Sequence, residues 1–189
     1  MIVVASLSLL LSIVILHRSF QRQSAKVVFY SFLVLGIGCT AYLPLAAYIP
    51  AYWLVMANYL RPMSLKTFSA SLLGMAVPFC YLGVYLLYKY NGTVGDWGLN
   101  ILNIKTDIEV PHVMLWVILV TLIAAMGRVY MFRVWQQKKV STRLKYNSVI
   151  ALIVFTLILA VIFPQHAAVL LGLLIALTLY SLWMLSPLY

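Results

Sequence analysis

Long runs of apolar residues, separated by short polar segments, dominate the pattern along this chain. The apolar runs cover Met1–Leu16, Val27–Leu60, Thr67–Tyr88, Val113–Phe132, Val149–Phe163 and Ala167–Leu185. A helix of about 20 apolar residues spans the hydrocarbon core of a bilayer. Backbone polar groups in lipid must bond within the protein, which favours helices over open strands. The pattern therefore predicts an all-α, polytopic transmembrane helical bundle.

The composition strengthens this interpretation. Hydrophobic residues make up 65% of the chain and charged residues only 8%, whereas about 25% of the residues of a soluble domain are charged. We therefore exclude a soluble protein and expect one transmembrane domain over residues 1–189. Cys39 and Cys80 both fall inside apolar runs, which favours small packing residues over a disulfide.

The apolar run Val27–Leu60 is too long for one span. As a single helix its 34 residues would measure about 51 Å, against a core of about 30 Å. Pro44 and Pro50 lie in its middle, and each lacks a backbone donor. Two structures are consistent with this run: one long kinked helix, or a tight hairpin of two short spans.

The distribution of Lys and Arg favours the hairpin, because cytoplasmic loops retain an excess of these residues. If Val27–Leu60 crosses twice, 11 of the 13 Lys and Arg residues are cytoplasmic and only Lys89 and Lys105 are outside. All three acidic residues then lie outside as well. A single crossing removes most of this bias. The basic stretch Arg133–Ser148 is therefore predicted to be a cytoplasmic loop.

The same reasoning predicts about seven spans, with the N-terminus outside and the C-terminus cytoplasmic. Pro164, Gln165 and His166 interrupt the last apolar region and indicate a tight outer turn. The first span is short, which leaves open that the native chain begins upstream of Met1. The predicted spans are 1–16, 27–43, 45–60, 67–88, 113–132, 149–163 and 167–185, with an outer loop at 89–112 and a basic cytoplasmic loop at 133–148.

The outer loop holds the residues best suited to chemistry. Asp96, Asp107, Glu109 and His112 are candidates for an acid/base or metal cluster. Their spacing does not match a known set of metal ligands, so solvated loop residues are the favoured interpretation. We expect no metal and no cofactor. The spans carry no charged residue at their centres, which argues against a proton-coupled transporter.

Basic residues beside the spans are predicted to contact anionic lipid headgroups, at roughly 1 kcal/mol each. Arg128 lies just inside the cytoplasmic end of its span, where its long side chain can reach the interface. The bilayer is thus the expected partner, with an unidentified membrane protein as a further one, and no nucleic-acid reader is encoded. The predicted headgroup contacts are Arg128, Arg133, Lys138, Lys139, Arg143 and Lys145.

Gly74 and Pro78 mark the most distinctive span, 67–88. Pro78 predicts a kink, and Ala70 with Gly74 forms a small-xxx-small pair that permits close helix approach. Broken helices also line transporter sites, but packing is the favoured interpretation because glycine and proline are common in spans.

Part of the chain resembles a known group of proteins. The segment Gly36–Leu87 contains a proline turn at Pro44, the R-x-x-S-x-K join Arg61–Lys66 and the L-L-G-x-x-x-P motif Leu72–Pro78. These features, with STRLKYNSVIALIVF at Ser141–Phe155, resemble an uncharacterised family of polytopic inner-membrane proteins from Bacteroidetes. The resemblance implies a helical protein of the bacterial inner membrane with no assigned activity, and it brings no catalytic residues.

The leading functional interpretation is a non-enzymatic accessory or assembly component of the envelope. The alternatives are a glycosyltransferase-like enzyme acting on a lipid-linked sugar, with Asp96 as its only candidate acid, and a component of a small-molecule transporter. An enzyme predicts an outer cavity lined by the acidic loop residues. A transporter predicts a polar cavity near Gly74 and Pro78, and an accessory protein predicts a lipid-facing apolar groove that a partner fills.

Overall fold

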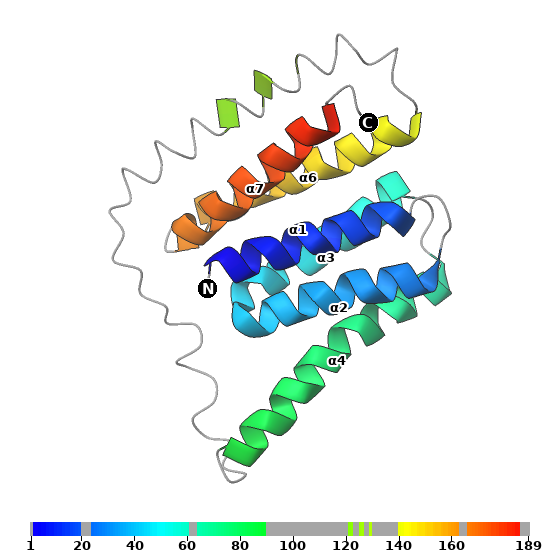
Figure 1. Cartoon of the computed structure of the whole chain (residues 1–189), viewed down its shortest axis with the longest axis vertical. Coiled ribbons are helices and arrows are strands. Elements are labelled where there is room, and N and C mark those ends of the chain that lie inside the picture. The colour runs from blue at the N-terminus through cyan, green and yellow to red at the C-terminus, as the bar shows by residue number, and fades with distance from the viewer. Residues whose placement is uncertain are drawn as a thin grey trace. The chain divides into compact units, whose positions relative to one another are not determined.

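The computed structural model describes residues 2–19, 24–60, 64–89, 121–122, 125–126, 129, 140–162 and 166–185 (Figure 1). Within these residues the chain is all-helical, as predicted, with no strand. Two helical segments, Leu65–Tyr85 and Val140–Ala160, are long and apolar enough to cross a membrane, and shorter apolar helices cover Val3–Arg18, Ala25–Ala41 and Val169–Met184.

The chain divides into two compact units. The first unit contains α1 (Ile2–Ser19), α2 (Ala25–Ala41), the short 3-10 helix η1 (Leu43–Ala47) and α4 (Leu65–Lys89). The second contains the π-helical turn η2 (Met56–Leu60), α6 (Val140–Ile162) and α7 (Ala167–Leu185). Helix α3 (Tyr48–Val55) carries the boundary between the units, which falls between Ile49 and Pro50.

The apolar stretch Val27–Leu60 is not one helix. Helix α2 ends at Ala41, where Tyr42 becomes extended and its N–H donates to the Gly38 carbonyl at 2.9 Å. Pro44 lies in the first turn of η1, a position in which the missing N–H costs no helical hydrogen bond. The residues that follow form η1, α3 and η2 in succession, a segmented helical return that the hydropathy pattern alone does not resolve.

Helix α4 begins with reciprocal capping. The Thr67 N–H donates to the Ser64 hydroxyl at 3.3 Å, and the Ser64 N–H donates to the Thr67 hydroxyl at 3.1 Å. These bonds satisfy donors that a helix start would otherwise leave without partners. Pro78 lies inside this 25-residue helix and cannot donate to the Gly74 carbonyl.

In the first unit, α2 lies antiparallel to α1 and parallel to α4. The antiparallel pairing follows from Ser12, which bonds to Ser31, and from Ser8, which lies against Gly38. On the other side of α2, Gly74 of α4 approaches Phe29, and Pro78 of α4 approaches Gly36 farther along both helices. Figure 1 shows α2 and α4 close together at their N-terminal ends and diverging toward their C-terminal ends.

The second unit contains a hairpin of α6 and α7, which pack against each other, while η2 contacts α6. Tyr146, Val149 and Leu152 of α6 are buried, as are Leu173 and Leu177 of α7. Helix α6 starts earlier than the span predicted at residues 149–163, because the helix includes the polar segment from Val140 onward.

Candidate functional site

The contact between α2 and α4 depends on two glycines. A Cβ atom added at Gly74 would lie 2.5 Å from the Phe29 carbonyl oxygen, and one added at Gly36 would lie 2.9 Å from Cγ of Pro78. Any side chain at either position would push the helices apart. Gly74 therefore serves close packing, as the small-xxx-small pair predicted, and the space beside it is filled.

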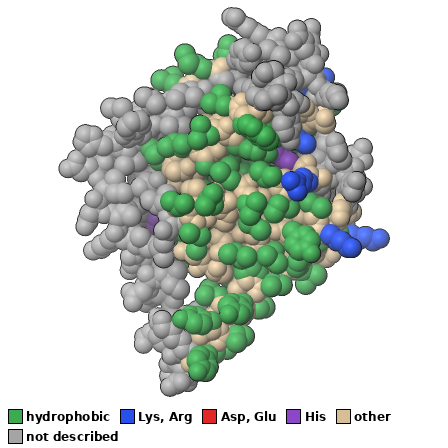
Figure 2. Space-filling view, viewed as in Figure 1, with side chains coloured by type: hydrophobic (Ala, Val, Ile, Leu, Met, Phe, Trp, Pro, Cys, Tyr) green, Lys and Arg blue, Asp and Glu red, His purple; other side chains and the backbone are tan. Residues whose placement is uncertain are grey.

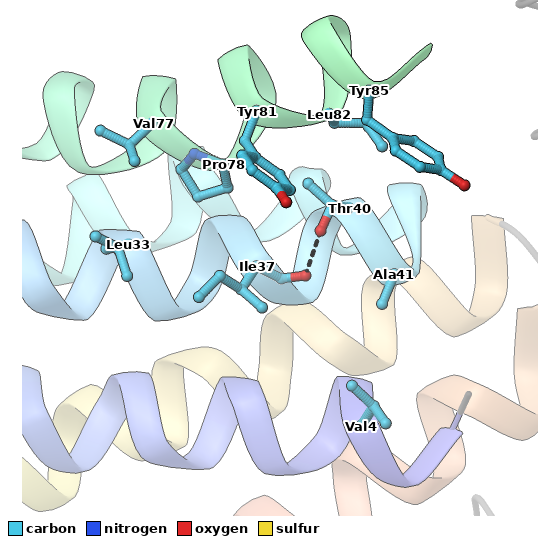
Figure 3. Close-up of a pocket in the computed structure, with 10 residues that line it drawn as sticks. All are labelled: Val4, Leu33, Ile37, Thr40, Ala41, Val77, Pro78, Tyr81, Leu82 and Tyr85. Carbon is cyan, nitrogen blue, oxygen red and sulfur yellow. Dashed lines mark hydrogen bonds between the residues drawn. The ribbon is translucent and has the colours of Figure 1, made fainter. Parts of the chain in front are cut away.

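Beyond Pro78 the two helices separate and leave an open groove of about 700 Å³. The groove is lined by Val4 of α1, by Leu33, Ile37, Thr40 and Ala41 of α2, and by Val77, Pro78, Tyr81, Leu82 and Tyr85 of α4 (Figure 3). None of these described lining residues is charged.

The polar atoms of the groove lie toward its wide end. The Thr40 hydroxyl donates to the Ile37 carbonyl at 2.8 Å, so its proton is already used within α2. In Figure 3 the Tyr81 ring points from α4 toward α2, and Tyr85 lies at the end remote from Leu33. The tyrosine side chains are 78% and 51% exposed. The groove is therefore an apolar surface with two phenol groups at its mouth.

Serine hydroxyls join α1 to α2 on the opposite side of α2. The Ser12 hydroxyl donates to the Ser31 carbonyl at 3.0 Å, and the Ser31 hydroxyl donates to the Ser12 carbonyl at 2.9 Å. Both residues are fully buried. Small polar residues of this kind let two helices approach closely and bond across the contact where the surroundings are apolar.

Three of the four described Lys and Arg residues of the first unit gather at one of its ends, whereas the fourth, Lys89, is the last residue of α4 and lies at the opposite end. Arg18 lies at the end of α1, Lys26 at the start of α2 and Lys66 at the start of α4, and all three are exposed. The helix directions described above bring these positions to the same end of the unit. The groove lies toward the opposite end, where α4 carries Tyr85 and Tyr88. The first unit thus has a cationic end and a tyrosine end.

The surface between these two ends is apolar. Among the exposed residues of α4 are Leu72, Leu73, Val77, Val84 and Leu87. Figure 2 shows hydrophobic side chains over much of the described surface on the face in view, including the lower part, where Figure 1 places α4. A soluble protein rarely exposes so continuous an apolar face.

Two of the predicted headgroup contacts lie on a helix. Arg143 and Lys145 are on the first turns of α6 and are partly exposed, between the buried residues Thr142 and Tyr146. The segment was expected to be a loop, but residues from Val140 onward are helical. The other predicted contacts, Arg128, Arg133, Lys138 and Lys139, lie outside the described residues.

The acidic outer-loop candidates, Asp96, Asp107, Glu109 and His112, also lie outside the described residues. Within the described part of the chain, no group of three His, Cys, Asp or Glu side chains is placed to hold a metal ion. His166, which precedes α7, is buried at 8% exposure, and burial lowers its pKa below the ordinary value of 6.5 because the charged imidazolium is disfavoured there.

Sequence reasoning expected an apolar groove for an accessory protein but did not place it between α2 and α4, although it singled out Pro78. The available signal was the placement of Tyr81 and Tyr85 one and two turns after the proline. That spacing puts the two aromatic rings on one face of the helix, past the kink. This spacing does not predict the direction in which α4 diverges from α2.

Comparisons with known proteins add no relative. No protein-family model matches the chain, and no curated protein and no solved structure is similar to it. The resemblance to the Bacteroidetes family stays a prediction. The functional argument therefore depends on the geometry of the described residues.

Proposed function

We propose that this chain is a multi-pass helical protein of the bacterial inner membrane that acts as a non-enzymatic accessory component of the envelope. In this proposal the N-terminus lies outside, the C-terminus is cytoplasmic, and the chain crosses the bilayer about seven times. The resemblance of Gly36–Leu87 and Ser141–Phe155 to uncharacterised inner-membrane proteins agrees with this placement.

The parallel pairing of α2 with α4 is the observation that carries the topology. If the stretch between their starts crossed the membrane only once, α4 would run in the opposite direction to α2. Parallel helices instead require the residues after Ala41 to return to the first side before Leu65. The segment formed by η1, α3 and η2 supplies this return, which supports the hairpin over one long kinked helix.

The charge distribution supports the orientation. Arg18, Lys26 and Lys66 lie at one end of the first unit, and basic residues beside spans favour the cytoplasmic side. The tyrosine end then lies at the outer interface, where tyrosine is enriched. Between these two ends, the exposed apolar face of α4 would contact lipid.

The apolar groove favours an accessory role over a transporter. A transporter was expected to have a polar cavity near Gly74 and Pro78, but Gly74 is packed against Phe29 and the described lining beyond Pro78 is apolar. Several hydroxyls donate within their own helices, as Ser71 does to Phe68 and Thr156 to Leu152. Because these hydroxyl groups donate their protons within the helix, they are not available as donors to a hydrophilic substrate.

Cysteine labelling tests the topology. In a background without Cys39 and Cys80, we compare Leu65→Cys with Tyr88→Cys, because the native side chains are 88% and 85% exposed at opposite ends of α4. A membrane-impermeant maleimide should label position 88 in intact spheroplasts and position 65 only after permeabilisation. Equal accessibility of both sites, or the reverse pattern, would overturn the proposed orientation.

A complementation assay tests the accessory role against the enzyme alternative. We replace Asp96, Asp107 and Glu109 together with the corresponding amides and express the variant in a strain that lacks the chain. If the chain is an accessory component, the variant should return the strain to wild-type behaviour as fully as the parent chain does. Loss of function with normal protein levels would favour the enzyme alternative.

A further inference from the structure

We propose that the groove between α2 and α4 binds one acyl chain of a membrane phospholipid from the leaflet at its tyrosine end. This inference deepens the proposed function and rests on it, because it assumes that the first unit crosses the bilayer. The accessory role predicts that a partner fills an apolar groove, and this inference assigns a lipid chain to that place.

The narrow end of the groove is the first argument. Gly36 and Pro78 approach so closely that no Cβ fits at Gly36, and Gly74 lies against the backbone of Phe29. The two helices are therefore in contact near Pro78, and the space between them widens toward the C-terminal ends of α2 and α4. An acyl chain that lies in the groove from the tyrosine end meets this contact at the narrow end.

The depth of the groove is the second argument. Its lining runs from Leu33 to Ala41 on α2 and from Val77 to Tyr85 on α4, which corresponds to about 12 Å along each helix at 1.5 Å per residue. A single leaflet contributes about 15 Å of the hydrocarbon core. The extent of the groove therefore matches the length of a lipid chain within one leaflet.

The chemistry of the lining is the third argument. Aliphatic side chains such as Ile37, Val77 and Leu82 form the walls, and the described lining residues carry no charge. A hydrocarbon chain loses no hydrogen bonds on entering such a site. The exposed phenol groups of Tyr81 and Tyr85 stand at the mouth, where each can donate a hydrogen bond to an ester or phosphate oxygen.

The test measures lipid retention by the full chain. We reconstitute it in vesicles of phosphatidylethanolamine and phosphatidylglycerol, extract it in detergent and count bound phospholipids by native mass spectrometry. Val77→Trp places an indole in the groove, and Leu73→Trp is the matched control, one turn earlier on the exposed surface of α4 but outside the lining.

The expected result is one retained phospholipid for the parent and for Leu73→Trp, with at least a tenfold loss for Val77→Trp. Removing one hydroxyl with either Tyr81→Phe or Tyr85→Phe should weaken retention by about fivefold, the effect of one hydrogen bond of ordinary strength. Should circular dichroism show that Val77→Trp is unfolded, Ala41→Trp fills the groove from the other helix and replaces it in the comparison.

The proposal is overturned if the parent retains no phospholipid, or if the groove-filling variant and its control retain equal amounts. A photo-crosslinker at position 77 that captures a protein segment instead of lipid would also overturn it, in favour of a partner helix. The labelling of positions 65 and 88 is independent of these results. The groove assignment can therefore fail while the topology stands.

Discussion

Replacing Gly74 with alanine should weaken the contact between α2 and α4. The new Cβ would lie 2.5 Å from the Phe29 carbonyl oxygen, 3.1 Å from Cβ of Phe32 and 3.2 Å from the Leu33 nitrogen. A carbon and a carbonyl oxygen normally lie about 3.3 Å apart or more, so the helices must separate by roughly 0.8 Å. The first obstacle is a backbone atom, and no change of rotamer can relieve it.

Separation of this size has a calculable cost. A gap of 0.5–1 Å forfeits about a quarter to a half of the dispersion energy of each contact it opens. Overpacking of a well-packed contact costs about 1–3 kcal/mol in total. At about 2–4 °C per kcal/mol for a chain of this size, we expect Tm to fall by roughly 2–12 °C for Gly74→Ala.

Gly83→Ala is the matched control on the same helix, because nothing lies within 4 Å of a Cβ added at Gly83. Alanine there should leave Tm unchanged or raise it, since alanine favours helix over glycine by about 1 kcal/mol. The measurement is thermal unfolding in detergent micelles, followed by circular dichroism at 222 nm. An unchanged Tm for Gly74→Ala, or an equal fall for both variants, would refute the close contact described for this pair.

Three further predictions follow from the described residues. Ser12→Ala and Ser31→Ala should each lower stability, and a double-mutant cycle should give a coupling energy of about 0.6 kcal/mol, as for other hydrogen bonds between membrane helices; additive effects would contradict the reciprocal bonds. His166 has a folded-state pKa below 6.5, so the unfolded chain binds its proton first and Tm should fall as pH drops from 7.5 through 6.5 toward the folded pKa. His166→Gln should flatten this part of the pH profile, and an unaltered slope would show that other groups cause it. Replacing Arg18 and Lys26 together with glutamine should increase the fraction of molecules with inverted topology, measured by protease protection of a C-terminal tag, whereas an unchanged pattern would show that later basic residues set the orientation.

The helical class and the importance of Gly74 and Pro78 could be predicted from the sequence, because both follow from local properties. Apolar runs of the right length favour helices, and glycine four residues before proline favours a close contact followed by a bend. The position of the groove could not be predicted, because it depends on the angle at which α4 leaves α2. That angle follows from the packing of Phe29 and Gly36 against residues distant in the sequence.

The start of α6 illustrates a different limit. Hydropathy marks the part of a helix that suits the hydrocarbon core, and it places the start of the span at residue 149. The helix itself begins at Val140 and carries Arg143 and Lys145 on its first turns, since backbone hydrogen bonds continue into the aqueous interface. Charged residues next to an apolar run therefore indicate where the core ends and leave the end of the helix undetermined.

The parallel pairing of α2 and α4 also constrains the order in which the protein can assemble. Helices α1 and α2 are adjacent and antiparallel, so they can pair as soon as both have left the ribosome. Helix α4 cannot reach its place on α2 until the connecting residues, which include η1, α3 and η2, have also been made. During synthesis, the face of α2 that receives Gly74 and Pro78 therefore stays without its partner until a helix made later arrives.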